Sequence, residues 1–400
     1  MEFKKGSLLD SIKVIDMGRI LAGPMCASIL ADMGADVIKI ESLDGDNSRD
    51  NLPKKNGVST YYLNFNRSKR GVTLDLKSPE GQEIFTKLVK QADVIVENFR
   101  PGVMDKLGFG YEDCVKINPG IIFASISGFG QKGPYSQRAG FDNIAQAMGG
   151  IMSVTGEPGH NRVRCGTSIG DVMAAQNAAL AIVAALWHRS RTGRGQAIDV
   201  ALTDVCIIGM SSMNLVYLTD GVIPELLGNG YAASAPGDSF PTKDGEGQIV
   251  FNTASPANWA TLCDVLGHPE WTKMPEFVDN ESRVKNRRML NDSISEVTRQ
   301  MDTDVILNKL LAAGLAAGPV FNVKQVAEDE HFQEFREMFV EVEHPGIGKI
   351  KINNQSFKMS ETTPYIRRSA PELGQHNTEV LKELGYTEKE IAELAKKKVI

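Results

Sequence analysis

The chain has 400 residues, 42% of them hydrophobic, and a formal net charge of −6 at pH 7, a composition typical of a globular protein with room for two domains. This acidic balance argues against wholesale binding to nucleic acid, although an anionic small molecule could bind where basic groups cluster. No apolar run is expected to span a membrane, and the stretch MEFKKGSLLD lacks the apolar core of a secretory signal. The five cysteines form no CxxC pair, which indicates reduced thiols and a cytoplasmic location.

The first half of the chain is predicted to alternate strands and helices. Short β-branched runs, typical of parallel strands buried on both faces, occur in SIKVIDMG, DVIKIES, ADVIVENF, GIIFASISGFG and QAIDVAL. Helices are predicted from Pro24 to Met33, from the Ser78-Pro79 cap to Lys90, from Asp171 to about Ser190, and from Thr203 to Thr219. This pattern predicts a doubly wound α/β sheet that binds ligands at the carboxyl ends of its strands.

The second half of the chain begins with GVIPELLGNGYAASAPGDSFPTKDGEG, whose glycines, prolines and serines indicate a boundary. Beyond it, residues 240–325 are predicted to form a smaller α+β domain that contains the strand QIVFN and a helix capped by Ser255. The tail should contain a hairpin in FVEVEHPGIGKIKIN and a last helix that begins with a capping box, Thr387 and Glu390.

Several catalytic motifs are missing from the sequence. There is no GxGxxG after the first strand, no P-loop, no HExxH and no GxSxG, so nicotinamide, flavin, metal and serine-hydrolase chemistry are not indicated. The segment SIGD places Asp171 where a nucleophile elbow would place serine. Asp171 is either the N-cap of the Ala-rich helix that follows or a nucleophile presented at the start of that helix.

Basic residues gather in three loops: NRSKRGVTLDLK, ENFRPGVMDKLG and GQKGPYSQRAGFDN. Each basic side chain is either a solvated surface charge or a ligand contact. Because the loops follow predicted strands, a phosphate-bearing ligand at that edge of the sheet would explain their placement.

Eight segments in order resemble the class III CoA-transferases, the group of formyl-CoA transferase and carnitine CoA-transferase. They are LAGP, ADMGADVIKIE, LNFNRSKRGVTLDLKSPEG, DVIVENFRPG, ISGFGQKGPYSQRAGFD, GTSIGD, GNGYAASAPGDSFPTKDG and APELGQHNTEVLKELGY. The resemblance implies a Rossmann-like large domain (residues 1–225), a small α+β domain (226–330), a segment that returns to the large domain (331–400), and a homodimer of interlocked rings. It implies no cofactor beyond coenzyme A as substrate, and neither a membrane nor a nucleic-acid partner.

The resemblance also assigns roles to residues. Asp171 corresponds to the acyl-carrying nucleophile, and the backbone of residues 228–233, including Gly228 and Gly230, is the candidate oxyanion hole. Asp142 is either a polar neighbour of the nucleophile or a turn-forming residue. The coenzyme A site maps onto Ile20, Leu21, Ala22, Leu74, Lys77, Asn98, Phe99 and Lys106. The chain has Ser42 where the family often has Arg, which weakens any claim to one particular nucleotide contact.

The reaction and the acyl group leave alternatives open. α-Methylacyl-CoA racemases share the fold but have His where this chain has Phe141, and a phenyl ring cannot transfer protons. The segment GNGYAASAPGDSF resembles the branch that moves CoA among 2-hydroxy acids, such as 2-hydroxyisocaproate or phenyllactate, in amino-acid fermentation. Carnitine, formate, oxalate and bile acids are family alternatives, and a CoA-binding protein without turnover also remains open.

Overall fold

The computed structural model describes residues 4–244, 248–253 and 255–400. The chain divides into two compact units, which are described separately. The first comprises Met1–Ile151, Arg164–Leu215 and Glu330–Ile400, and the second comprises Met152–Val163 and Val216–Asp329.

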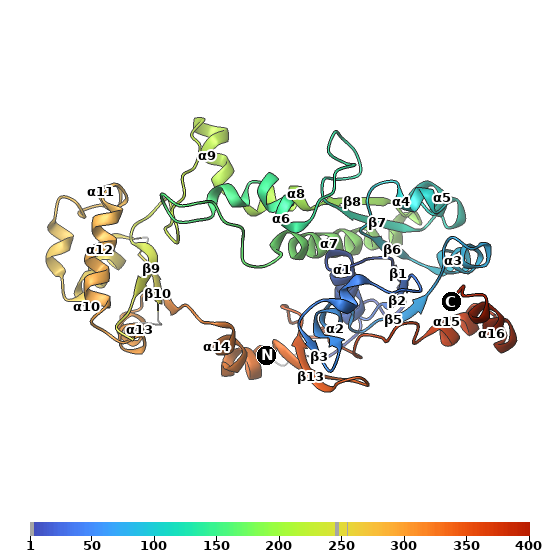
Figure 1. Cartoon of the computed structure of the whole chain (residues 1–400). Helices are drawn as coiled ribbons and strands as arrows, with labels where there is room; N and C mark the ends of the chain where they lie inside the picture. Colours follow the sequence, from blue (N-terminus) through green and yellow to red (C-terminus); the bar gives the residue numbers. More distant parts are fainter. Residues whose placement is uncertain (1–3, 245–247, 254) are drawn as a thin grey trace. The chain divides into compact units, whose positions relative to one another are not determined.

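A six-stranded sheet in the order β5-β2-β1-β6-β7-β8 forms the centre of the first unit (Figure 1). Every pair of neighbouring strands in it is parallel, which confirms the predicted doubly wound α/β class. The strands are β1 (Lys13–Asp16), β2 (Asp36–Glu41), β5 (Arg70–Thr73), β6 (Val94–Glu97), β7 (Ile122–Ser127) and β8 (Ala197–Ala201). The order reverses between β1 and β6, and the carboxyl ends at such a switch point are where open α/β sheets bind ligands.

Alternate residues of each strand supply two separate cores, one on each face of the sheet. Val14 of β1 packs with α1 (Ala22–Asp32) and α7 (Ile169–Thr192), whereas its neighbour Ile15 packs on the opposite face. That opposite face is covered by α3 (Pro79–Gln91), α5 (Tyr111–Ile117), α15 (Asn377–Glu383) and α16 (Glu388–Lys396). The chain therefore uses its last helices to complete the cover of the sheet that its first strands begin.

The sequence predicts that the segment NRSKRGVTLDLK is a basic loop, either solvated or in contact with a ligand. The structure differs from this prediction. Residues 70–73 of the segment are the edge strand β5, and its first three cations are buried in ion pairs within the protein. Arg67 pairs with Asp32 at 2.9 Å, Lys69 with Asp16 at 2.7 Å, and Arg70 with Asp36 and two glutamates of α15. Pattern reasoning missed this strand because its charged side chains hide the β-branched core residue Val72.

Shorter elements complete the first unit. Around the sheet lie η1 (Asn47–Asp50), β3 (Lys54–Lys55), β4 (Val58–Ser59), α2 (Thr60–Asn66), α4 (Val103–Lys106), α6 (Asp142–Met148), α8 (Leu202–Gly209) and η4 (His331–Phe335). The predicted tail hairpin is confirmed as β12 (Phe339–His344) paired antiparallel with β13 (Gly348–Asn353). The capping box is confirmed as well, because Thr387 and Glu390 exchange both of its hydrogen bonds.

The predicted long helix from Thr203 to Thr219 is wrong. The chain forms α8, breaks over residues 210–212, and continues as α9 (Met213–Asp220). Ser211 lies in the left-handed region with a φ of 53°, which an α-helix cannot contain. Gly209 and two serines at this point lower the helix propensity of the sequence.

Helix α7 also differs from expectation, because its length and composition would allow it to cross a membrane, as would α8 and α9 taken together. Within the unit, one face of α7 is buried in the core beside the sheet and α1. Its buried residues are Gly170, Ala174, Ala175, Ala178, Ala179, Ile182, Ala185 and Leu186. Small residues dominate this face, which lets α7 pack closely against its neighbours.

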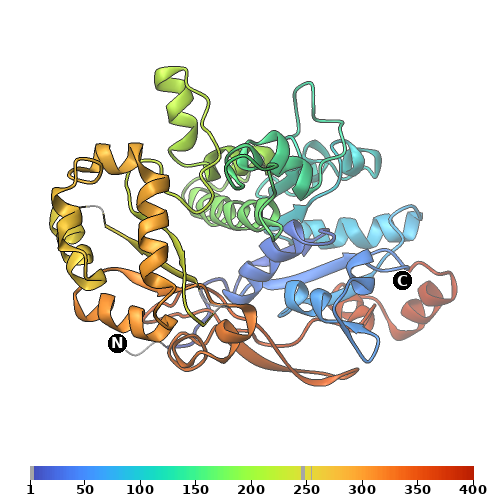
Figure 2. The same cartoon turned by 60° about the vertical axis from the view of Figure 1, so that its left-hand side comes forward.

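The second unit is built on an antiparallel sheet in the order β11-β10-β9 (Figure 2). Its strands are β9 (Gly237–Pro241), β10 (Gln248–Asn252) and β11 (Ala317–Pro319), and its helices are α10 (Pro256–Leu266), η3 (Pro269–Lys273), α11 (Asn280–Lys285), α12 (Arg287–Thr298), α13 (Thr303–Ala312) and α14 (Val323–Glu328). The core contains Trp259, Trp271 and the stacked rings of Phe240 and Phe251. The helix predicted after Ser255 is α10, and the Ser255 side chain caps it.

Candidate functional site

A cavity of about 200 Å³ lies in the first unit, at the carboxyl ends of β1, β6 and β7. Its position at the β1/β6 switch point is the one that the strand order predicts for a ligand. The lining includes seven residues that the sequence singled out from distant segments: Ile20, Leu21, Ala22, Asn98, Phe99, Asp142 and Asp171.

Asp171 is the third residue of α7, not its N-cap. The helix begins at Ile169, and the N-cap residue, Ser168, makes no side-chain capping bond. Among the described residues, none donates a hydrogen bond to the Asp171 carboxylate, which is half-buried and faces the cavity. The interpretation of Asp171 as a capping residue is therefore wrong.

The carboxylate that caps α7 belongs to Asp142, the first residue of α6. Its Oδ1 accepts the N–H of Gly170 at 2.8 Å and that of Asp171 at 3.3 Å. Gly170 fits here because a Cβ would meet Asp142 Oδ1 at 3.0 Å and the Cys206 sulfur at 3.2 Å. Asp142 thus approaches the start of α7 closely and brings a second carboxylate beside Asp171.

Gln146 fixes this arrangement, and sequence reasoning did not identify it. The fully buried side chain donates to Asp142 Oδ2 at 2.6 Å and to the Thr167 carbonyl at 3.2 Å, and accepts the N–H of Cys165 at 2.8 Å. It therefore joins α6 to the chain just before α7. No motif distinguishes it in the sequence; the only available signal was its place one turn after Asp142.

The pKa of Asp171 is raised to about 7, first by burial and second by the neighbouring charge of Asp142. At neutral pH roughly half of the carboxyl groups are then ionised. These two effects outweigh the stabilisation that the N-terminus of a helix gives to an ionised carboxylate. Burial and the two carboxylates also raise the pKa of Cys206 to about 11, so that thiol stays protonated.

Tyr61 of α2 is a further neighbour that the sequence did not indicate. Burial, and after it the charges of Asp171 and Asp46, raise the pKa of its phenol well above the usual range. The phenol is therefore protonated at neutral pH and can donate a hydrogen bond.

The turn after β1 forms part of the cavity wall. Ile20 has a φ of 65°, a left-handed conformation that is rare for a β-branched residue and costs roughly 1–3 kcal/mol. Asn98 holds the residue before it, accepting the N–H of Arg19 at 2.7 Å and donating to its carbonyl at 2.9 Å. The loops after β1 and β6 are thereby tied together at the switch point.

Three arginines, Arg19, Arg100 and Arg138, line the cavity, and all three are exposed. Arg19 lies over the ring of Phe99 and Arg138 over that of Tyr135, at 5.3 and 3.9 Å. These contacts hold the guanidinium groups while leaving their N–H groups available. The cavity can therefore receive an anionic ligand such as a phosphate or a carboxylate.

Phe141 lines the same cavity next to Asp142, and its side chain is 71% exposed. The resemblance places it where α-methylacyl-CoA racemases have a proton-transferring histidine. An aromatic hydrocarbon there supplies an apolar surface but no acid or base.

Other predicted site residues lie elsewhere. Among the described residues, the cavity lining does not include Leu74, Lys77 or Lys106: Leu74 is buried in the core behind the sheet, and the two lysines are exposed. Their roles toward coenzyme A stay predictions.

Gly228 and Gly230 belong to the second unit. Gly228 has a φ of 61°, a left-handed conformation that favours glycine. The N–H of Gly228 donates to Gly156 and that of Gly230 to Leu227, both at 2.9 Å. In this conformation those two N–H groups are engaged, so an oxyanion hole would have to use other donors of the stretch.

Comparison with known proteins places these residues in a family context. Residues 9–377 match the family model described as CoA-transferase family III. The chain is 37% identical to the succinyl-CoA–D-citramalate CoA-transferase of Chloroflexus aurantiacus over 98% of each chain. It is 37% identical to the human succinyl-CoA:glutarate CoA-transferase, over 96% of this chain and 88% of the relative.

Solved structures agree with this result. A crystal structure of a CAIB/BAIF family protein from Brucella suis superposes with a TM-score of 0.86 at 35% identity, covering 95% of this chain and 100% of the other.

Because the pKa of Asp171 is raised, replacing this residue with a neutral one should stabilise the folded protein by an amount that depends on pH. Above pH 7 the folded protein must hold an ionised, partly buried Asp171, whereas below about pH 4 the group is protonated in both folded and unfolded chains. We expect Asp171→Asn to raise the Tm at pH 8 by roughly 2–4 °C, with the gain vanishing near pH 4. Asp204→Asn, which changes an exposed aspartate in the first turn of α8, should show no such difference. Equal Tm values for Asp171→Asn and wild type at pH 8 would contradict the cause assigned to the raised pKa.

Proposed function

Because this chain belongs to CoA-transferase family III, we propose that Asp171 is the nucleophile with which it moves CoA from an acyl-CoA to a free carboxylic acid. The observation that carries the proposal is the position of Asp171: a carboxylate without a hydrogen-bond donor among the described residues, facing a cavity beside a second carboxylate. A purely structural aspartate would be hydrogen-bonded or solvated.

The steps of the reaction balance without any further reactant. The Asp171 carboxylate attacks the thioester carbonyl, forming a mixed anhydride and releasing the CoA thiolate. The thiolate attacks the aspartyl carbonyl of the anhydride, which releases the first acid and leaves CoA on Asp171 as a thioester. The acceptor carboxylate attacks this thioester to give a new anhydride, and the thiolate returns to its acyl carbonyl, which frees Asp171. Each intermediate is an activated acyl group, so the energy of the thioester is retained.

The environment of Asp171 suits this nucleophilic role. Burial and the charge of Asp142 make the carboxylate more basic than a solvated aspartate, and a more basic carboxylate is a better nucleophile. A pKa near 7 still leaves a large ionised fraction at neutral pH. Asp142 itself acts through position and charge, since its oxygens are engaged by Gly170, Asp171 and Gln146.

We propose that the coenzyme A ester lies along the turn of residues 20–22 and the loop at Asn98 and Phe99, which line the same cavity as Asp171. The arginines of the cavity support this assignment, because coenzyme A carries phosphates. We further infer a cytoplasmic homodimer; exposed apolar side chains of α7, Leu180 and Trp187, at 70% and 68% exposure, support a subunit interface.

For the substrates, we propose that succinyl-CoA or a similar dicarboxylyl-CoA is the donor and a dicarboxylic acid the acceptor. Relatives that are 35–38% identical over most of the chain carry names with succinyl-CoA, citramalate, mesaconate, glutarate and oxalate. The cavity arginines supply cations for a second carboxylate, whereas the sequence around Gly237 contains no cluster of cations. The 2-hydroxy monocarboxylic acids expected from GNGYAASAPGDSF are the second candidate; citramalate has both a 2-hydroxyl and a second carboxylate.

Covalent trapping tests the nucleophile. With succinyl-CoA and hydroxylamine, we expect wild-type protein to form a hydroxamate on the peptide that contains Asp171, detected by mass spectrometry. Asp171→Ala should form none and should lower CoA exchange by roughly 10³-fold or more. Asp204→Asn should behave as wild type. Full exchange in Asp171→Ala would remove the mechanism, and binding of CoA without any trapped adduct would favour a binding protein without turnover.

The pH profile of kcat/KM tests whether the charge of Asp142 raises the pKa of Asp171. Only ionised Asp171 attacks, so kcat/KM for the acyl-CoA should fall tenfold per pH unit below an apparent pKa of about 7. Asp142→Asn removes the neighbouring charge while leaving the burial of Asp171 unchanged, so the acidic limb of the profile should move to lower pH. The position of the limb is the readout rather than the absolute rate, because the substitution also perturbs the contact with Gln146. An unmoved limb would show that Asp142 does not influence the titrating group.

A panel of acceptors tests the substrate class. With succinyl-CoA as donor, we expect glutarate, mesaconate and citramalate to give kcat/KM values at least roughly tenfold above that of 2-hydroxyisocaproate, because arginine binds a second carboxylate bidentately. Arg138→Gln should lower the values for the dicarboxylates more than that for 2-hydroxyisocaproate. If 2-hydroxyisocaproate is the better acceptor, the second candidate is the correct one.

A further inference from the structure

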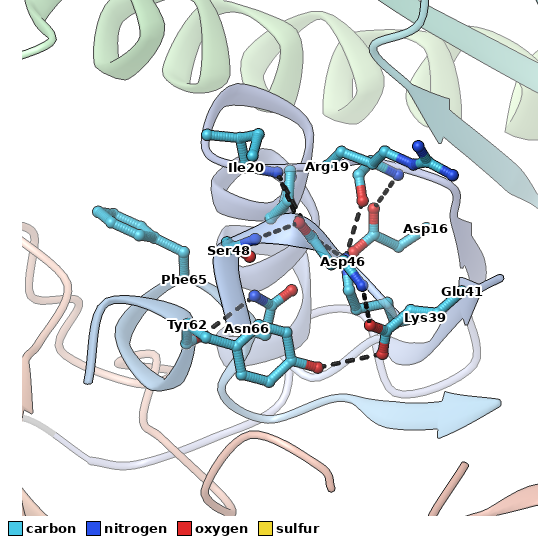
Figure 3. Close-up of polar contacts among 12 residues, drawn as sticks. Asp16, Arg19, Ile20, Lys39, Glu41, Asp46, Ser48, Tyr62, Phe65 and Asn66 are labelled. Carbon is cyan, nitrogen blue, oxygen red and sulfur yellow. Dashed lines mark hydrogen bonds and ion pairs between the residues drawn. The ribbon is translucent and has the colours of Figure 1, made fainter. Parts of the chain in front are cut away.

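The strained residue Ile20 is held by a carboxylate that does not line the cavity. Asp46 accepts the Ile20 N–H at 3.2 Å through Oδ1 and 3.3 Å through Oδ2, as Figure 3 shows. The Asp46 side chain is fully buried and forms an ion pair of 3.0 Å with the equally buried Lys39 of β2. Lys39 in turn donates to the carbonyl of Gly18 at 2.8 Å. One buried ion pair thus contacts the backbone on both sides of Arg19.

The same carboxylate is itself fixed in place. The backbone N–H of Asp46 donates to Glu41 at 2.8 Å, and Asp46 Oδ1 caps η1 by accepting the N–H of Ser48 at 2.9 Å. Lys39 and Glu41 both lie on β2, a central strand of the sheet. Asp46 therefore connects the turn after β1 to the sheet by hydrogen bonds and an ion pair.

Stability alone does not explain a buried ion pair here. Removing two charges from water is costly, and two apolar side chains of similar size would often be at least as stabilising. An apolar pair, however, could neither accept the Ile20 N–H nor donate to the Gly18 carbonyl. What the charges provide is one particular backbone conformation of the cavity wall.

We propose that Asp46, together with Lys39, is a positioning residue for the acyl-CoA substrate: the pair holds Ile20 in its left-handed conformation and so sets the shape of the turn that receives the coenzyme A ester. This inference rests on the proposed function, because it assumes that the turn binds coenzyme A. Asp46 touches no reacting atom and acts through the backbone of residues 18–20.

The test is a double-mutant cycle between positions 46 and 20. Asp46→Ala removes the acceptor and should raise the KM for succinyl-CoA roughly tenfold while changing kcat and the KM for the acceptor acid less than about threefold. Glycine adopts a positive φ without a Cβ, so Ile20→Gly in the Asp46→Ala background should restore most of the loss. Ile20→Gly alone should raise the KM for succinyl-CoA only modestly, through lost contact with the ligand.

Asp44→Asn is the matched control, because Asp44 lies in the same loop and is exposed. It should leave both KM values unchanged. If Asp46→Ala does not fold, the cycle is repeated with Asp46→Asn, which keeps the size of the side chain but loses the ion pair with Lys39.

Either of two kinetic results would overturn the inference: an unchanged KM in the Asp46 variants, or a double variant whose KM equals the product of the two single effects. Failure of both Asp46 variants to fold would also overturn it, because it assigns Asp46 a local role. The proposed function is read separately, from hydroxamate formation at Asp171 in the wild-type protein. Trapping at Asp171 with a normal KM in Asp46→Ala would leave the function standing and remove only the positioning role.

Discussion

The contact between Asp142 and the first turn of α7 determines the chemistry of the site. One oxygen of Asp142 satisfies the N–H groups of Gly170 and Asp171, so the capping requirement of α7 is met from another helix. The Asp171 side chain is thereby free of any structural task. The same contact brings a second negative charge close to Asp171, which together with burial makes its carboxylate basic. A capping arrangement within α7 itself would have engaged the carboxylate that we propose as the nucleophile.

The sheet determines which loops share the cavity with that carboxylate. Because the strand order reverses between β1 and β6, the loops after these strands diverge and leave a crevice at their carboxyl ends. Each loop contributes backbone and an arginine to the cavity, and Asn98 joins the two. The carboxylate on α7 and these two loops therefore line one cavity, and its arginines give a chain with a net charge of −6 a local site that can receive an anionic ligand.

The sequence predicted the parts of the fold that hydrophobic patterns encode. Five of the six strands of the large sheet are apolar runs, and their parallel arrangement follows from the helices between them. β5 was missed because its core residue, Val72, is surrounded by cations whose partners lie far away, among them Glu379 and Glu383 of α15. The break at Ser211 was missed for a related reason, since apolar residues at helical spacing on both sides conceal a change in chain direction.

Within the site, seven residues were found by resemblance, and the remaining contacts could not have been found from local sequence. Gln146 acts through groups 19 and 21 residues further along the chain, and Asp46 acts on a residue 26 positions earlier. Such residues form no local motif, because they satisfy buried polar groups that only the folded chain brings together.

Buried charges in this protein are concentrated where the backbone must adopt one conformation. Asp16 accepts the N–H of Gly18 at 2.8 Å while paired with Lys69, which also donates to the Pro24 carbonyl at 2.8 Å. Burial lowers the pKa of Lys69 to about 8, yet its ammonium remains the common donor to both ends of the turn that leads into α1. An apolar core tolerates small shifts among packed side chains, whereas a charged group in low dielectric must keep its partners at hydrogen-bond distance. These ions carry a desolvation cost, and their hydrogen bonds fix the backbone of the turn over residues 16–24, part of which lines the cavity.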